Sequence, residues 1–178
     1  MSNTVIAARG AVGIRRLAVA LMLAVAAVLG IVAITPAPAQ AATSLATRVD
    51  NFVSAHRGHA VGTGQCVALV HSYDAAVLGW NETGTPGDTG AHEWWDDFGA
   101  KAGLSAHYTK VKASATAKKG DLAVYSTAVG HGAGHIAIVL KDKGSTLKVF
   151  QQNWNTGYAS VDTSMTKSHL LGYLRPKA

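Results

Sequence analysis

The chain has a single cysteine, Cys66, and the residues around it are those expected around a nucleophile. Residues 62–65 (GTGQ) favour a turn, and the apolar residues after Cys66 recur at helical spacing, which predicts a buried helix with Cys66 in its first turn. The free N–H groups and the positive end of the dipole at a helix start stabilise a thiolate. A buried and inert cysteine is the alternative, and residues 62–77 alone favour neither.

A nucleophilic thiol needs a base, and His135 is placed best among the eight histidines. It follows the glycine-rich turn 130–134 and begins the apolar run 136–140, so a core strand would hold its ring rigidly beside an open loop. His131 is the reserve candidate, because its two flanking glycines would hold it loosely. The spacing H-G-A-G-H also raises a zinc site, but it has no glutamate and its glycines disfavour a helix. We therefore expect no metal and no other cofactor.

An amide side chain on the next strand can orient the histidine ring. Residues 146–153 read as a strand, and the two-residue period puts Gln151 and Asn153 on the same face. Either carboxamide oxygen could accept Nδ1–H of His135 and aim the other ring nitrogen at Cys66. We also expect Gln65 and the first backbone N–H groups of the cysteine helix to form an oxyanion hole.

The first 41 residues have the pattern of a targeting segment and are not expected to be part of the fold. Three arginines precede the uncharged run 17–34, and the small residues of A-Q-A follow at 39–41. This order predicts a secretory signal peptide that is removed; a retained membrane anchor is the alternative. Residues 42–178 would then form a single extracytoplasmic domain with no stable membrane insertion.

The 178 residues carry 16 basic and 10 acidic side chains, a formal charge of +6 that falls to +3 without the first 41 residues. That excess suits an anionic cell envelope and is too small to indicate nucleic acid as a partner. Hydrophobic residues make up 48% of the chain and charged residues 15%, which excludes a disordered protein.

Six short motifs occur in one order along the chain and together resemble a known family. They are G-Q-C-V-A-L-V at 64–70, H-E-W-W at 92–95, K-G-D-L-A-V-Y at 119–125, G-H-I-A-I-V at 134–139, F-Q-Q-N-W at 150–154 and L-G-Y-L-R-P at 171–176. The set closely resembles the CHAP domain, the cysteine, histidine-dependent amidohydrolase/peptidase family of peptidoglycan hydrolases. The resemblance covers residues 50–176, but Gln151 stands where the family usually has glutamate, in E-Q-N.

This resemblance implies an α+β, papain-like fold with N-terminal helices, in which the nucleophile helix packs on an antiparallel sheet. It implies Cys66 as nucleophile and His135 as base, with Asn153 or Gln151 as the third member. Trp94, Trp95 and Trp154 are candidates for the substrate groove, although core packing is the safer expectation for at least one of the first two.

The implied activity is that of a secreted or wall-associated monomer that cleaves an amide bond of peptidoglycan through a thioester. The motifs do not distinguish the stem peptide, the cross-bridge and the muramoyl–alanine linkage, so both endopeptidase and amidase remain open. The main alternative is a wall-binding module of the same fold with weak or no activity, which the neutral Gln151 favours.

Overall fold

The computed structural model describes residues 43–81, 90–100, 102–154 and 157–177. The expected signal peptide, residues 1–41, lies outside this part of the chain. Within the described residues no helix is both long and apolar enough to cross a membrane.

The helices of the described residues include the cysteine helix that the sequence predicts. They are α2 (Leu45–His56), α3 (Cys66–Tyr73), a π-helical turn η1 (Asp74–Leu78), α4 (Glu93–Asp96) and α5 (Ala102–His107). Ser44 caps α2, because its Oγ accepts a hydrogen bond from the Thr47 N–H at 3.2 Å. The helix α3 starts at Cys66, as predicted, and η1 extends it until Gly79 ends the turn in the left-handed conformation.

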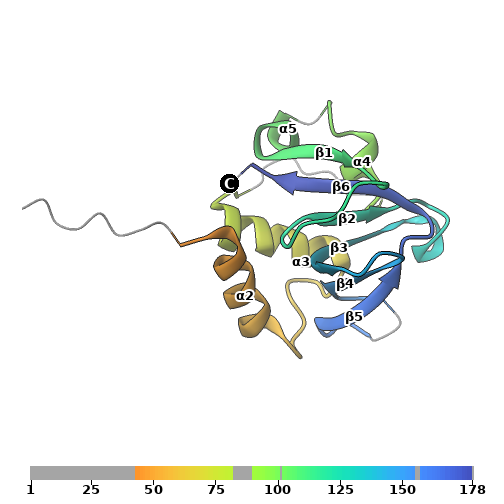
Figure 1. Ribbon diagram of the computed structural model, residues 1–178. Helices are drawn as coiled ribbons and strands as arrows, with labels where there is room; N and C mark the ends of the chain where they lie inside the picture. The colour runs from red at the N-terminus through yellow and green to blue at the C-terminus, as the bar shows by residue number, and fades with distance from the viewer. Residues whose placement is uncertain (1–42, 82–89, 101, 155–156, 178) are drawn as a thin grey trace, which may run out of the picture. The chain divides into compact units, whose positions relative to one another are not determined.

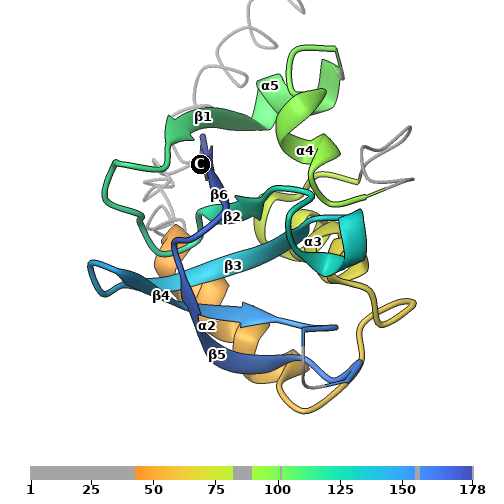
Figure 2. The same ribbon diagram turned by 90° about the vertical axis from the view of Figure 1, so that its right-hand side faces the viewer.

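The strands form one antiparallel sheet. They are β1 (Tyr108–Lys112), β2 (Leu122–Tyr125), β3 (His135–Asp142), β4 (Thr146–Gln151), β5 (Val161–Thr166) and β6 (Leu170–Pro176), in the order β1-β6-β2-β3-β4-β5. Figures 1 and 2 show α2 and α3 on one side of this sheet. The α+β class, with the cysteine helix packed on an antiparallel sheet, is confirmed.

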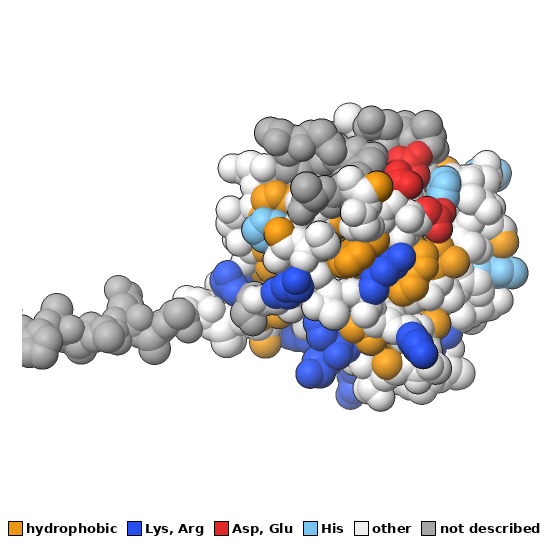
Figure 3. Space-filling model, turned by 90° about the horizontal axis from the view of Figure 1, so that it is seen from above, with side chains coloured by type: hydrophobic (Ala, Val, Ile, Leu, Met, Phe, Trp, Pro, Cys, Tyr) orange, Lys and Arg blue, Asp and Glu red, His pale blue; other side chains and the backbone are white. Residues whose placement is uncertain are grey.

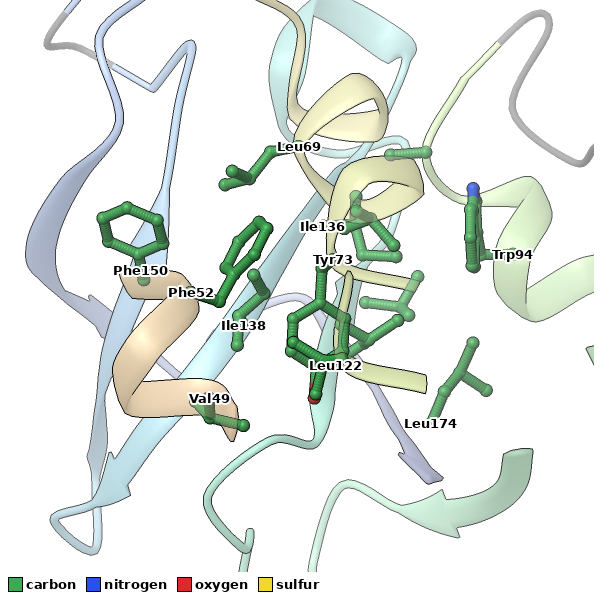
Figure 4. Packing of buried hydrophobic residues seen from close by; sticks show 14 of the residues in the cluster. Val49, Phe52, Leu69, Tyr73, Trp94, Leu122, Ile136, Ile138, Phe150 and Leu174 are labelled. Atoms are coloured by element: carbon green, nitrogen blue, oxygen red, sulfur yellow. The ribbon is translucent and has the colours of Figure 1, made fainter. Parts of the chain in front are cut away.

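The main core lies between the helices and the sheet. Figure 4 shows Leu69 and Tyr73 of α3 packed among side chains of the sheet and of α2. The Phe52 ring meets the rings of Tyr73 and Phe150 edge-on, at centroid distances of 5.6 and 6.4 Å. Each such buried side chain contributes roughly 1.5–3 kcal/mol to stability. This packing fixes α3 against β3, the two elements that carry the candidate nucleophile and base.

A second, smaller core lies on the opposite face of the sheet, with Tyr125, Val149 and Met165 among its buried members. No described helix belongs to this cluster; the sheet curls over it instead. The hydroxyl of Tyr125 on β2 donates to the carbonyl of Thr166 on β5 at 3.0 Å, although two strands separate β2 from β5 in the sheet. The curl brings the outer edge of β5 close to the residues beside His135.

Charged side chains do not define one binding surface on the face seen from above. Figure 3 shows Lys and Arg side chains spread over this face, with Asp and Glu gathered at one side. A nucleic-acid surface concentrates basic residues in a patch or stripe. The face in Figure 3 does not have that pattern.

Candidate active site

The thiol of Cys66 lies where α3 meets the start of β3. Backbone N–H groups of Ile136 on β3, and of Cys66 and Val67 in the first turn of the helix, lie near enough to the sulfur to lower its pKa. Cys66 and His135 line the same hollow, which has a volume of about 520 Å³. Cysteine and histidine, 69 positions apart in the sequence, thus share one cleft.

Burial and backbone N–H groups act in opposite directions on the thiol. Burial raises the pKa of Cys66 above its ordinary value, and the hydrogen bonds from Ile136 and the helix start lower it without cancelling the effect of burial. The sequence analysis expected the helix start to favour a thiolate. The backbone contribution has that sign, but burial outweighs it, so the resting side chain is a thiol at neutral pH.

His135 begins β3 with its side chain buried; 2% of the residue is exposed. Its ring is near two aromatic rings, with its centroid 4.8 Å from that of Trp154 and 6.5 Å from that of Tyr125. Burial lowers its pKa to about 4, and the Gln151 side chain works weakly in the opposite direction. The imidazole is therefore neutral at neutral pH, which is the form that can accept a proton.

The glycine before His135 is required by the backbone. Gly134 has φ +73°, and a Cβ there would lie 2.6 Å from the carbonyl oxygen of Tyr125. The glycine-rich turn thus allows the chain to enter β3 close against β2, as its composition indicated.

Gln151 and Asn153, the two candidates for the residue that orients His135, lie in different surroundings. Gln151 ends β4 wholly buried beside His135. Among the described residues, neither polar atom of its carboxamide, nor Nε2 of His135, has a hydrogen-bond partner of good geometry. The Gln151 amide therefore lies near enough to raise the histidine pKa, but it is not aligned for a full hydrogen bond.

Asn153 does not continue the strand, so the prediction that it shares a face with Gln151 is wrong. β4 ends at Gln151, and Asn153 is exposed with φ +59°, which turns the backbone out of the sheet. Its Nδ2 donates to Oε1 of Gln65. Asn153 thus contacts the residue before the nucleophile instead of the base.

Gln152 is a site residue that the sequence analysis missed. It is wholly buried, and its Oε1 accepts from the Val61 N–H and the Ser160 hydroxyl, both at 3.0 Å. Its Nε2 donates to the carbonyls of Val61 at 2.9 Å and Gln65 at 2.6 Å. This side chain ties the loop that precedes Cys66 to the end of β4. The available signal was the strand alternation, which puts Gln152 on the core face with Phe150, where a polar group must be paired.

The loop before the cysteine is also held by ring packing. Gly64 has φ +81°, and a Cβ at this position would lie 2.8 Å from the Tyr158 side chain. Only glycine fits between that side chain and the turn that leads into Gln65 and Cys66.

The three tryptophan candidates are in different places. Trp154 lines the cleft together with Gln65. Trp94 is 0% exposed in the main core (Figure 4), so it has no surface to offer a substrate. Trp95 packs against Gly172, and the Lys110 ammonium lies 4.4 Å from its ring centroid. Trp94 is thus excluded from the groove, as expected for at least one of the pair, and the half-buried Trp95 packs on β1 and β6 and is not among the described residues that line the cleft.

His131 lies at the rim of the same cleft, exposed and with φ +54°. It belongs to a short 3₁₀ turn, Gly130–Gly132, and not to the helix that a zincin pair needs. In the part of the chain described, no three His, Cys, Asp or Glu side chains gather closely enough to hold a metal ion.

A cysteine at the start of a helix, packed on an antiparallel sheet whose strand begins with a histidine, defines the papain-like class of α+β folds. Residues 56–153 match the family model of the CHAP domain, more than half of the chain. The chain belongs to the CHAP domain family.

Solved structures share this fold at low sequence identity. The crystal structure of Ly7917 aligns with a TM-score of 0.59 and 21% identity over 75% of this chain and 62% of that one. Ly7917 was also solved "with the hydrolyzing product of MDP", at 22% identity, over 75% and 63% of the two chains with a TM-score of 0.59. The wild-type endolysin LysIME-EF1 aligns at 0.58 and 18% identity, over 74% and 63%. The chain thus spans just under two thirds of these solved chains. None of the curated proteins compared matches it significantly.

Proposed function

We propose that the chain is a cysteine-dependent peptidoglycan hydrolase that cleaves an amide bond. The observation that carries the proposal is the shared cleft, which both Cys66 and His135 line. The backbone N–H of Ile136, the residue after His135, is near enough to the sulfur to lower the pKa of Cys66. Membership of the CHAP family and the fold shared with an endolysin support the substrate class.

The reaction begins from a neutral pair. His135 accepts the Cys66 proton as the sulfur attacks the carbonyl carbon, and the carbonyl oxygen becomes an oxyanion. Backbone N–H groups of Cys66 and Val67 are the first donors to that oxygen. The Gln65 amide is the second, since Asn153 holds its Oε1 and leaves Nε2 as the donor.

Collapse of the oxyanion breaks the C–N bond, and protonated His135 gives its proton to the leaving amine. The acyl group remains on Cys66 as a thioester. Water then attacks the thioester carbonyl while His135 takes its proton, which releases the carboxylic acid and restores the thiol. We assign the buried ring nitrogen Nε2 of His135 to face Gln151, and Nδ1 to exchange the proton with Cys66. The sequence analysis expected the opposite, with Nδ1 toward the amide.

The proposed hydrolase acts outside the cytoplasmic membrane as a monomer, after loss of a signal peptide at residues 1–41. Support for export is the charge and hydropathy order of those residues and the location of the substrate. N-terminal sequencing of the exported chain tests it, with a start near Ala42 expected.

Zymography on purified cell walls tests the mechanism. Cys66→Ala and Cys66→Ser should abolish clearing, whereas Ser72→Ala, on the same helix, should clear like wild type. The two histidines of the cleft give a second matched pair: His135→Ala should lower the rate by about 10²–10⁴-fold, and His131→Ala by far less. Clearing by Cys66→Ala equal to wild type would falsify the cysteine mechanism.

A wall-binding module with little or no turnover is the second candidate. One observation favours it: burial raises the pKa of Cys66 and lowers that of His135, so no thiolate–imidazolium pair exists at rest. A chain that sediments with cell walls but releases no soluble fragments would support this alternative over the hydrolase.

A further inference from the structure

A second hollow adjoins the candidate active site and has no role in the mechanism above. Its volume is about 310 Å³, near the lower limit for small-molecule sites. Its lining residues are Tyr125, Val129, Trp154, Ser164, Met165, Thr166, Ser168 and His169. Val129 and Trp154 also line the catalytic cleft, so the two hollows share one wall. A substrate bound across this wall would occupy both.

One side of the second hollow is the outer backbone edge of β5, the last strand of the sheet. The Lys167 N–H donates to the Ser145 carbonyl of the preceding turn, so in this antiparallel pair the odd-numbered residues of β5 bond to β4. The N–H and C=O groups of Ser164 and Thr166 therefore point away from β4. The Tyr125 hydroxyl, which reaches the Thr166 carbonyl, confirms this direction.

The other side of the hollow is aromatic, and the described residues that line it include no Asp, Glu, Lys or Arg. Trp154 is half-buried and contributes its side chain to both hollows. A peptide that carries free carboxylates would find no cation here. A neutral pyranose ring has apolar C–H faces that pack on aromatic side chains, and hydroxyl and acetamido groups that match backbone donors and acceptors.

We infer that this hollow binds one N-acetylated sugar ring of the peptidoglycan glycan strand. The inference rests on the proposed function and makes it more specific. A sugar seated behind Trp154 lies next to Cys66 and His135, so the amide that reaches the sulfur is one close to the sugar. That geometry selects the muramoyl–alanine linkage over the peptide cross-bridge, and it makes the glycan part of the recognised substrate.

Binding is tested without catalysis. The Cys66→Ala chain is titrated with tri-N-acetylchitotriose and followed by the NMR signals of the Trp154 indole N–H and the His169 ring. Both signals should shift saturably. Ser168→Leu fills the hollow and should weaken binding about tenfold or more, and Ser105→Leu, on the far helix α5, should not. Unshifted Trp154 and His169 signals, or equal binding by both leucine variants, would overturn the sugar site.

Substrate choice gives the second readout. The wild-type chain should hydrolyse a disaccharide-linked stem peptide and leave the same peptide without sugar uncut, and Ser168→Leu should lower kcat/KM for the first. Equal rates on the two substrates overturn the inference and leave the cysteine hydrolase intact. Loss of cysteine-dependent cleavage of both substrates, with chitotriose still bound at Trp154, would instead refute the proposed function alone.

Discussion

Gln151 stands where a carboxylate would change the resting state of the site, and Gln151→Glu tests this directly. The two side chains have the same shape, so the substitution changes charge more than packing. Burial holds the His135 pKa at about 4, and Gln151 is the side chain that raises it. A carboxylate here would stabilise the imidazolium far more strongly than the neutral amide does.

The size of the effect follows from the contact. Two unit charges about 4 Å apart interact by roughly 4 kcal/mol at an effective dielectric constant near 20, equal to about three pKa units. The cost of burying the carboxylate at a position with 0% exposure reduces this gain. We therefore expect Gln151→Glu to raise the His135 pKa by about 1–3 units, to about 5–7.

NMR titration of the His135 ring in a Cys66→Ala background measures that pKa without coupling to the thiol. With Cys66 restored, iodoacetamide should alkylate the Gln151→Glu chain faster than wild type at pH 7, because the imidazolium stabilises the thiolate. Gln151→Met, a neutral side chain of similar length, is the control and should raise neither quantity. A His135 pKa within half a unit of wild type in Gln151→Glu would refute the assignment of Gln151 to the histidine.

Three further predictions concern stability, each measured by urea unfolding. In the unfolded chain His135 takes up a proton below about pH 6.5, but in the folded chain it does so only near its pKa of about 4. The free energy of unfolding should therefore fall by up to about 3 kcal/mol as the pH drops from 6.5 to 4. The variant His135→Gln should show a much smaller fall. Gln152→Leu leaves buried backbone groups unpaired and should cost about 2–4 kcal/mol, whereas Gln151→Leu, which breaks no well-formed bond, should cost under 1 kcal/mol; equal costs contradict the hydrogen-bond account. Gly64→Ala should lower the free energy of unfolding more than Gly144→Ala. Both positions have positive φ, which costs about 1–2 kcal/mol for alanine, but only the new Cβ at position 64 would collide with a side chain, that of Tyr158. A larger loss for Gly144→Ala would contradict this packing.

The sequence predicted the parts of the site that depend on local pattern. The glycine-rich turns at 62–64 and 130–134 marked the start of α3 and the entry to β3, because positive φ and close approach leave a strong compositional signal. The apolar run 136–140, which the sequence analysis placed in a core strand, lies within β3. Periodicity and turn chemistry act over a few residues, so one sequence suffices to read them.

The features that the sequence could not predict depend on contacts between residues far apart in the chain. Residues 161–166 form β5 although they are mostly polar, because pairing with β4 and the curl of the sheet hold them. Asn153 and Gln152 appeared as ordinary strand residues, since the loop they bind lies 88 and 91 positions away. The balance on the Cys66 thiol also required the structure, because burial is set by the whole fold.

The protonated state of the single cysteine has a consequence for how long the proposed hydrolase stays active. Oxidants such as peroxide react with thiolates, and a chain with one cysteine cannot rescue a sulfenic acid through an internal disulfide. Burial that keeps the sulfur protonated therefore slows oxidation of the thiol. Burial thus makes Cys66 a weak nucleophile at rest and, for the same reason, a thiol that oxidises slowly.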